Sequence, residues 1–523
     1  MVSENPFVDP HDPLPSSDQR PRESPFAMEA TLTVGKTATL TLGTDALLAL
    51  DEEREGGGFA SAIQCCGLSS KFNTLSIPFY NILWAELVGS ELSIQYASPV
   101  SKNVVKSTEL KYDLEGLGLD VVQPWISQLL DKSYGEAQQQ KRALVLVNPH
   151  AGKGNAVKWY YNDAEPILQA ARCKIDVIIT KHGGEAVDIA NNMDIDAFDI
   201  VVTCSGDGLA YEVFNGLGKR ADARKALSKI AVTHIPCGSG NAMSHNLYGT
   251  NSPSIAALGI IKGIPTPLDL ISITQGDTRT LSFLSQSVGI IAECDLGTEN
   301  LRWMGSARFT YGFLVRLFGK ICYPCDLAVK VAIEDKASIK EHYRKELEST
   351  VPTSERRGNK YPFDDDSSAT STSGASSNDE GLPPLKYGTI NDKLPDGWEL
   401  VPYDKLGNFY CGNMAYMTAD TNFFPTTLPN DGLMDLICIN GDISRLSAVS
   451  MIASVENSTL IDLDVVSYRK ILAYRIIPKN QKDGYISIDG ERIPFAQFQA
   501  EIHRGLGTVL TKSGNRYEQR GPP

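Results

Sequence analysis

Several features that would assign a protein to a special class are missing from this 523-residue sequence. It has no run of 18 or more apolar residues, so we expect no membrane-spanning segment. The first residues are rich in proline, serine and charge, and they contain no apolar core of a secretory signal. The 10 cysteines follow no regular spacing, so reduced thiols are expected instead of a disulfide framework. Together these absences predict a soluble cytoplasmic protein.

Basic residues are also in deficit. The 49 Lys and Arg residues against 63 Asp and Glu residues give a formal net charge of −14, which argues against nucleic acid as a partner. Contact with an anionic membrane would need a local basic patch. Residues 468–482 hold five basic and no acidic residues, and they form either a peripheral membrane contact or a strand edge protected by lysines. Acylation of Cys65 or Cys66 is a second route to a membrane.

The sequence divides into regions of different pattern. Residues 1–27 are expected to form a disordered tail. Residues 28–135 alternate short apolar and polar runs and end in one helix, which predicts a small β-rich domain similar to a pleckstrin-homology barrel. Residues 140–270 alternate strand and helix patterns, which predicts a doubly wound α/β domain. Residues 271–515 predict an antiparallel β-rich domain, with a disordered, Ser/Asp/Gly/Pro-rich insertion at 346–385.

The α/β region is organised around residues 205–208, Ser-Gly-Asp-Gly, which follow an apolar strand pattern and precede a helix pattern. A helix N-terminus offers free N–H groups to phosphate, and glycine lets the backbone approach a ligand closely. Asp207 would repel phosphate unless a metal ion or an incoming hydroxyl lies beside it. The motif therefore predicts phosphoryl transfer to an alcohol, with Asp207 accepting or orienting the hydroxyl proton. Taken alone, it is equally compatible with an ordinary β-turn.

Three predicted parallel strands are followed by glycine-rich loops, residues 148–154, 205–208 and 236–242. Because the carboxyl ends of parallel strands meet at one edge of a sheet, we expect these loops to form one site. The first loop does not match the Walker P-loop, and the second lacks the third glycine of the Rossmann fingerprint. The sequence therefore predicts a nucleotide site of another type.

The loops and their neighbours resemble the diacylglycerol kinase-type catalytic domain, and within that superfamily a sphingosine (long-chain-base) kinase. The resemblance covers about residues 140–340 and 390–510, and the N-terminal extension suits fungal or plant members. The motifs that carry it are Asn148-Pro-x-x-Gly152-Lys153-Gly154, Ser205-Gly-Asp-Gly-Leu-x-x-Glu212-Val-x-Asn215-Gly216-Leu, Gly238-Ser-Gly-Asn-Ala242, Gly289-Ile-Ile-Ala-Glu-Cys-Asp295-Leu and Asp489-Gly490-Glu491.

The resemblance implies that ATP, with Mg²⁺, phosphorylates the primary hydroxyl of a sphingoid base, and that Asp207 is the catalytic residue. Asp295 is implied to bind the amine of the base. His150 stands where a family member has arginine, so its phosphate contact is either weaker or made by a neighbour. No metal ligand is assigned. The implied nucleotide-binding positions are Asn148, Pro149, His150, Gly152, Lys153, Gly154, Thr180, Ser205, Gly206, Gly208, Glu212, Gly238, Ser239, Gly240, Asn241, Arg302, Arg308, Asp489, Gly490 and Glu491. The implied substrate-binding positions are Ser205, Gly206, Asp207, Gly208, Ser285, Asp295, Phe309, Phe313 and Leu317.

Several of these residues also have structural interpretations, which the sequence leaves open. Arg302 and Arg308 do not share one helix face, so they are either solvated charges or triphosphate contacts. Glu212 either stabilises a helix N-terminus or orients the catalytic carboxylate. Asp295 is expected just after a half-buried strand, where a carboxylate needs a partner. That partner is either a cationic side chain or the amine of a ligand.

The same residues distinguish between the competing functions. A diacylglycerol or ceramide kinase would act on a neutral head group and leave Asp295 without a cation to bind. A catalytically silent, nucleotide-binding membrane adaptor would not need Asp207. A polyphosphate or NAD kinase does not explain the apolar stripe of Phe309, Phe313, Leu317 and Ile321, which either packs in a core or lines the path of a lipid tail. The expected partners are a sphingoid base and, peripherally, intracellular or plasma membranes, and a homodimer is compatible with the sequence.

Overall fold

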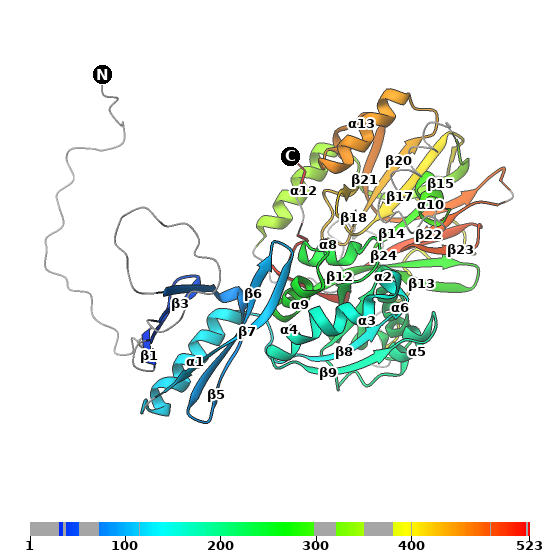
Figure 1. Ribbon diagram of the computed structural model, residues 1–523. Helices are drawn as coiled ribbons and strands as arrows, with labels where there is room; N and C mark the ends of the chain where they lie inside the picture. Colours follow the sequence, from blue (N-terminus) through cyan, green and yellow to red (C-terminus); the bar gives the residue numbers. More distant parts are fainter. Residues whose placement is uncertain are drawn as a thin grey trace, which may run out of the picture.

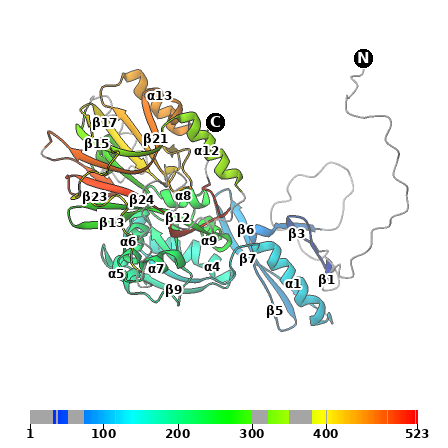
Figure 2. The ribbon, with the colours of Figure 1, turned by 180° about the vertical axis from the view of Figure 1, so that it is seen from behind.

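The computed structural model describes residues 31–34, 38–51, 73–114, 116–297, 321–349, 380–398, 400–481, 483–518 and 521–522. A β-rich N-terminal region lies beside a larger body, and most strands of that body form one continuous sheet (Figure 1). Both views place the α/β elements at one end of that body and α12 and α13 at the other (Figure 2). Predictions that fall outside the described residues concern the tail 1–27, Cys65, Cys66, Arg302, Arg308, Phe309, Phe313, Leu317 and residues 350–379.

The N-terminal region is β-rich and ends in a helix, as predicted. Its strands form two antiparallel sheets, β1–β4 and β5–β7, and α1 buries Val122, Trp125, Ile126 and Leu129 against them. These residues recur every three or four positions, which is the spacing of one helix face. The likeness to a pleckstrin-homology barrel stays a prediction. The bounds are β1 Thr31–Val34, β2 Ala38–Leu42, β3 Ala46–Asp51, β4 Asn73–Pro78, η1 Phe79–Asn81, β5 Ile82–Val88, β6 Glu91–Ser101, β7 Val104–Asp113 and α1 Leu119–Tyr134.

The N-terminal region shares its hydrophobic core with the α/β region. Lys262, at the end of α9, inserts its ammonium between the two and donates hydrogen bonds to the carbonyl oxygens of Ile82 and Ser133. The same ammonium lies 3.7 Å from the centre of the Tyr134 ring. Burial lowers the pKa of Lys262 to about 7. The two regions are therefore packed together as one unit.

The α/β region contains four parallel strands in the order β11-β10-β8-β9. Every residue of β10 and β11 is buried, as their continuous apolar runs predict. The chain passes from β8 to β9 on one side and then to β10 on the other, so the strand order reverses between β8 and β10. Ligands bind at such a point, outside the carboxyl ends of the strands. The bounds are β8 Arg142–Val147, α2 Ala151–Gly154, α3 Ala156–Trp159, η2 Tyr160–Ala164, α4 Glu165–Ala170, β9 Lys174–Ile179, α5 Glu185–Asn192, β10 Ile200–Ser205, α6 Asp207–Gly218, α7 Ala223–Lys229, β11 Ala231–Pro236, α8 Ala242–Tyr248 and α9 Pro253–Lys262.

The last strand, β24, joins the two halves of the large sheet. It pairs in parallel with β11, where Val232 faces Val509, and antiparallel with β12 and β21. The expected domain boundary at residue 270 therefore falls inside β12. The remaining pairs are antiparallel, as predicted. The bounds are β12 Ile264–Gln275, β13 Thr278–Ser282, β14 Ser285–Gly289, α10 Ile290–Leu296, β15 Cys325–Ile333, α12 Lys336–Glu348, β16 Val401–Tyr403, β17 Leu406–Gly412, β18 Tyr416–Thr418, β19 Thr421–Asn422, β20 Met434–Asn440, α13 Arg445–Glu456, η5 Leu460–Asp462, β21 Val466–Pro478, β22 Ile486–Ile488, β23 Glu491–Ile493 and β24 Phe498–Thr511.

Both interpretations of the basic run 468–482 are wrong for its described part. Most of the run belongs to β21, which lies inside the sheet and not at its edge. Lys470 is 0% exposed and Arg475 is 6% exposed. Arg469 and Lys479 are both paired with carboxylates. Arg469, Lys470 and Lys479 are therefore paired with carboxylates, and Arg475 is buried against neutral oxygen acceptors. These four side chains do not form a free cationic surface.

The expected insertion is ordered at both ends. Helix α12 continues to Glu348, and the backbone N–H of Arg224 donates to the carbonyl oxygen of Glu380 at 3.1 Å. Leu382 packs against the main hydrophobic core. Residues 350–379 of the expected insertion lie outside the described residues. None of the helices described here is both long and apolar enough to cross a membrane.

Candidate active site

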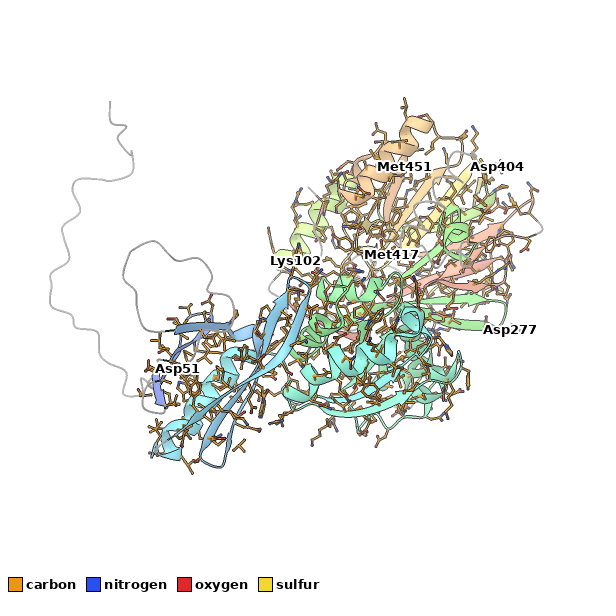
Figure 3. All side chains as sticks on the ribbon, viewed as in Figure 1. Asp51, Lys102, Asp277, Asp404, Met417 and Met451 are labelled. Atoms are coloured by element: carbon orange, nitrogen blue, oxygen red, sulfur yellow. The ribbon has the colours of Figure 1, made fainter. Side chains whose placement is uncertain are left out.

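A cavity of about 700 Å³ lies at the carboxyl ends of β8, β10 and β11 and extends into the β-rich half. One end is lined by the glycine-rich loops and the other by apolar side chains. Figure 3 labels Met417, where the two halves meet, and Met451 on α13 beyond it. The predicted site residues that line this cavity are Asn148, His150, Gly152, Lys153, Ser205, Gly206, Asp207, Gly208, Glu212, Gly238, Ser239, Gly240, Ser285, Asp295, Asp489, Gly490 and Glu491.

The second and third loops touch through their glycine backbones. A Cβ atom on Gly238 would lie 2.4 Å from the Cα atom of Gly206, so any side chain there would push the loops apart. The third loop is closed by Asn241, whose Oδ1 accepts from the N–H of Gly238 at 2.7 Å. Asn241 is 1% exposed. Its carboxamide therefore shapes the loop from behind and does not line the cavity.

The first loop has an unusual backbone. Gly152 and Lys153 both adopt left-handed conformations, with φ of 59° and 56°. Gly152 has no room for a side chain, because a Cβ atom would lie 2.3 Å from the Trp159 ring and 2.9 Å from the carbonyl oxygen of Cys237. Lys153 is exposed and lines the cavity. A non-glycine residue in this conformation costs about 1–2 kcal/mol, and such strain is typical of binding sites.

Asp207 is the first residue of α6, and its carboxylate connects this helix to α8. The Oδ2 atom accepts from the N–H of Ala242 at 3.0 Å, and Oδ1 accepts from the N–H of Met243 at 2.9 Å. Burial lowers the pKa values of His234 and His245 despite the nearby Asp207, so these imidazoles are neutral at pH 7. The carboxylate is thus oriented by backbone donors, and each oxygen keeps a lone pair for a ligand.

Asp489 organises the turn that leads into β14. Its carboxylate accepts from the Ser282 hydroxyl at 2.6 Å and from the N–H groups of Phe283, Leu284 and Ser285 at 2.8, 3.0 and 2.8 Å. Burial raises the pKa of Asp489 to about 6, against the effect of these four hydrogen bonds. Asp489 therefore fixes the position of Ser285. A direct nucleotide contact by Asp489 stays a prediction.

Glu491 and Glu212 have different surroundings. The Oε1 atom of Glu491 lies 3.0 Å from the place of a Cβ atom on Gly208, beside the N-terminus of α6. Glu212 accepts from the N–H of Ala186 at 3.2 Å, near the start of α5. Glu212 therefore contacts the N-terminus of α5 and not that of its own helix α6, which one of its two interpretations expected, and it also lines the cavity.

Asp295 lies on α10 and not after a strand. The predicted strand ends at Gly289, whose φ of 96° turns the backbone into the helix. The half-buried carboxylate accepts from the Ser487 hydroxyl at 2.9 Å. It faces the cavity together with Ser285 and the Asp489-Gly490 turn. Asp295 therefore places a carboxylate between the glycine-rich loops and the apolar end of the cavity.

Four of the predicted nucleotide positions that the structure describes do not line the cavity: Pro149, Gly154, Thr180 and Asn241. Thr180 is 5% exposed, and its hydroxyl lies 3.4 Å from the carbonyl oxygen of Val147. Most of the apolar wall carries no signal in the sequence. These side chains come from distant segments that carry no glycine motif, and only Ile291 stands inside a quoted motif. The wall consists of Leu284, Ile291, Tyr410, Met417, Phe423, Ile452 and Val455.

The carboxylates of the cavity decide whether Mg²⁺ could bind there. No cluster of three or more His, Cys, Asp or Glu side chains suited to a metal ion occurs in the part of the chain that the structure describes. Asp207 and Glu491 are carboxylates at the nucleotide end of the cavity. Mg²⁺ commonly binds one or two carboxylates together with substrate phosphates and water. The donors therefore fit an ion that arrives with a nucleotide.

The class of protein follows from this fold and these loops. A family model described as the diacylglycerol kinase catalytic domain matches residues 142–273, the region that carries all three loops. A second model, a domain of unknown function (DUF7493), matches residues 30–135. Among solved structures, a diacylglycerol kinase from Bacillus anthracis str. Sterne is similar over 71% of this chain and 97% of its own, at 16% identity and a TM-score of 0.46. The protein contains a catalytic domain of the diacylglycerol kinase type.

Full-length relatives narrow the class. Sphingoid long chain base kinase 5 of Saccharomyces cerevisiae is 37% identical over 74% of this chain, which spans 62% of that relative's length. Sphingoid long chain base kinase 4 of Schizosaccharomyces pombe is 34% identical over 85% of this chain and 90% of its own length. Sphingosine kinase 1 of Arabidopsis thaliana is 28% identical over 71% of this chain. The chain belongs to the sphingoid long-chain-base kinase family.

Proposed function

We propose that this protein transfers the γ-phosphoryl group of ATP to the primary hydroxyl of a sphingoid long-chain base. One observation carries the proposal: a single cavity joins three glycine-rich loops, the carboxylates of Asp207 and Asp295, and an apolar wall. The order of these features matches the order of groups in the reaction. Phosphates, a reacting hydroxyl, an amine and a hydrocarbon tail would meet them in turn.

The loops supply the phosphate end. The N-terminus of α6 lines the cavity and has no side-chain cap, and the helix dipole there favours negative charge. Lys153 adds a cationic side chain at the rim. Mg²⁺ that arrives with ATP would neutralise phosphate charge, with Asp207 and Glu491 as its nearest carboxylates. Phosphoryl transfer depends mainly on such positioning and charge stabilisation.

Asp207 handles the proton of the attacking hydroxyl. Two backbone N–H groups hold its carboxylate in place, so the oxygens present lone pairs in a fixed direction. The hydroxyl O–H bond breaks as the new P–O bond forms, and the proton passes to the carboxylate. The leaving group is ADP. General-base assistance of this kind contributes about 10²–10⁴-fold to the rate.

Asp295 selects the lipid. A sphingoid base carries a protonated amine next to the hydroxyl that is phosphorylated, whereas diacylglycerol and ceramide carry none. Moving that ammonium into a partly apolar cavity is unfavourable unless a carboxylate meets it. The half-buried carboxylate of Asp295 is held by Ser487 at a suitable place between the loops and the apolar wall. We extend the proposal to a cytoplasmic enzyme that meets its substrate at the surface of intracellular or plasma membranes.

A substrate panel tests this function. Purified protein is incubated with radiolabelled ATP, with and without Mg²⁺, and with sphingosine, dihydrosphingosine, phytosphingosine, ceramide or diacylglycerol in detergent micelles. We expect Mg²⁺-dependent labelling of at least one free base and none of ceramide or diacylglycerol. Preferential labelling of a neutral lipid would instead show a diacylglycerol or ceramide kinase. Nucleotide binding without any transfer would show a silent adaptor.

A further inference from the structure

Helix α13 carries apolar residues on two opposite sides, and among the described residues only one of these sides is covered. Ala448 and Met451 are each 2% exposed and pack into the protein. On the opposite side, Leu446 is 85% exposed and Val449 is 54% exposed, and Ala453 continues this face one turn further on. Neighbouring exposed apolar side chains mark sites of contact with proteins or membranes. The outer face of α13, defined here as Leu446, Val449 and Ala453, is therefore a candidate contact surface.

The outer face is continuous with the lipid end of the cavity. Ile452, Val455 and Glu456 of the same helix line that end, so α13 separates the cavity from the surface that carries Leu446 and Val449. Single exposed leucines are common on protein surfaces and need no explanation. Leu446 and Val449 differ from such single residues, because they are neighbours on a helix that lines a proposed lipid site. A lipid substrate has to reach that site from a bilayer.

Charge decides how such a surface would bind. Helix α13 has no acidic residue before Glu456, its last residue. The whole chain carries a formal net charge of −14, and its basic run on β21 is buried or paired. Coulombic attraction to anionic lipid is therefore not available from that run. Burial of apolar side chains remains as the driving force, and it does not depend on anionic lipid or on low salt.

We infer that the outer face of α13 is a membrane-docking surface, which seats the lipid end of the cavity on the acyl layer of a bilayer. The inference rests on the proposed function, because it takes the substrate to be a membrane lipid. Figure 1 places α13 at the end of the large body away from the N-terminal sheets. Docking through α13 would thus leave the N-terminal region away from the bilayer contact.

The test uses the full chain produced in bacteria, so that Cys65 and Cys66 are not acylated. Sedimentation with neutral phosphatidylcholine vesicles measures the partition coefficient of the wild type and of the double variant Leu446→Ser, Val449→Ser. A matched control, Leu119→Ser with Val121→Ser, alters side chains that are 68% and 45% exposed on α1. We expect at least about a tenfold loss for the α13 variant and less than about a twofold change for the control. Raising the salt concentration should leave wild-type binding unchanged.

Kinase assays separate this inference from the proposed function. With sphingosine in detergent micelles, the α13 variant should match the wild type, which also shows that it is folded. With sphingosine embedded in vesicles, its rate should fall in proportion to its partition coefficient. A wild type without activity on micellar sphingosine would refute the proposed function and leave the vesicle-binding result standing.

Three results would overturn the docking surface. The first is wild-type protein that does not bind neutral vesicles, and the second is an equal loss of binding in both double variants. The third is unchanged vesicle binding combined with conversion from dimer to monomer, measured by light scattering. That last result would make the outer face of α13 a contact between two copies of the chain.

Discussion

Replacement of Asp295 by asparagine is expected to weaken recognition of the sphingoid amine while ATP binding stays nearly unchanged. The carboxylate lies in the cavity beside Ser285 and accepts a hydrogen bond from Ser487 at 2.9 Å. Asparagine has nearly the same shape, and its amide oxygen still accepts from that hydroxyl. The substitution therefore removes a charge from the site without removing the contact that holds the side chain.

The size of the effect follows from the burial of the site. Loss of one partner of a buried, hydrogen-bonded charge pair costs about 2–5 kcal/mol. Asp295 is only half-buried, so water screens part of the attraction and the lower end of that range applies. We expect a loss of about 2–3 kcal/mol, which corresponds to a roughly 30- to 150-fold higher KM for sphingosine.

A substrate–protein cycle measures this interaction directly. The rate constant kcat/KM is determined for sphingosine and for N-acetylsphingosine, which has no ammonium, with the wild type and with Asp295→Asn. The wild type should prefer the free amine strongly, and the variant should discriminate little between the two lipids. A variant that keeps the wild-type preference would refute amine binding by Asp295. Loss of ATP affinity with unchanged sphingosine affinity would assign Asp295 to the nucleotide end.

Further predictions concern stability and loop geometry. Lys470→Met should destabilise the fold by about 3–5 kcal/mol in urea unfolding, because it leaves buried carboxylates without their cation. Burial opposes ionisation of Asp431, but Lys470 and His342 lower its pKa to about 2. The ionised carboxylate therefore stabilises the fold fully above about pH 4, and this stabilisation is lost as the pH falls toward 2. Urea titrations of the wild type at different pH values should show the loss. Gly238→Ala should lower ATP affinity by at least about tenfold in calorimetry, since a Cβ atom would lie 2.4 Å from the Gly206 backbone, and unchanged affinity would contradict the tight loop contact. Replacement of residues 350–379 by a short Gly/Ser linker should leave kcat on micellar sphingosine within about twofold, because doubling a loop's length costs only about 0.6 kcal/mol; insoluble protein would contradict this.

The sequence predicted the α/β region well because its signals are local. The strands β8 to β11 are short, apolar and rich in β-branched residues, which is the pattern of buried parallel strands. The rule that parallel strands end at one edge then placed the three loops together. Asp207 and the loop glycines were found in this way, since each belongs to a motif of a few adjacent residues.

The remaining features depend on contacts between distant segments. β24 joins the two halves of the sheet by pairing Val509 with Val232, and no local sequence pattern predicts that pairing. Lys470 reads as a surface charge, yet it is buried because Asp431 and Asp435 reach it from a neighbouring segment. The apolar wall of the cavity has the same origin. Its side chains look like ordinary core residues until the fold turns them toward one space.

The measurement that tests the central claim most directly is phosphoryl transfer by Asp207→Asn. Asparagine cannot accept from both Ala242 and Met243, so about 1–3 kcal/mol of stability is expected to be lost, and unfolding curves establish that the variant is folded under assay conditions. With saturating ATP and micellar sphingosine, single-turnover transfer should slow by about 10²–10⁴-fold, while the Kd for ATP changes little. A folded variant that transfers phosphate within a few-fold of the wild-type rate would contradict the role of Asp207 as the proton acceptor, and with it the proposed mechanism.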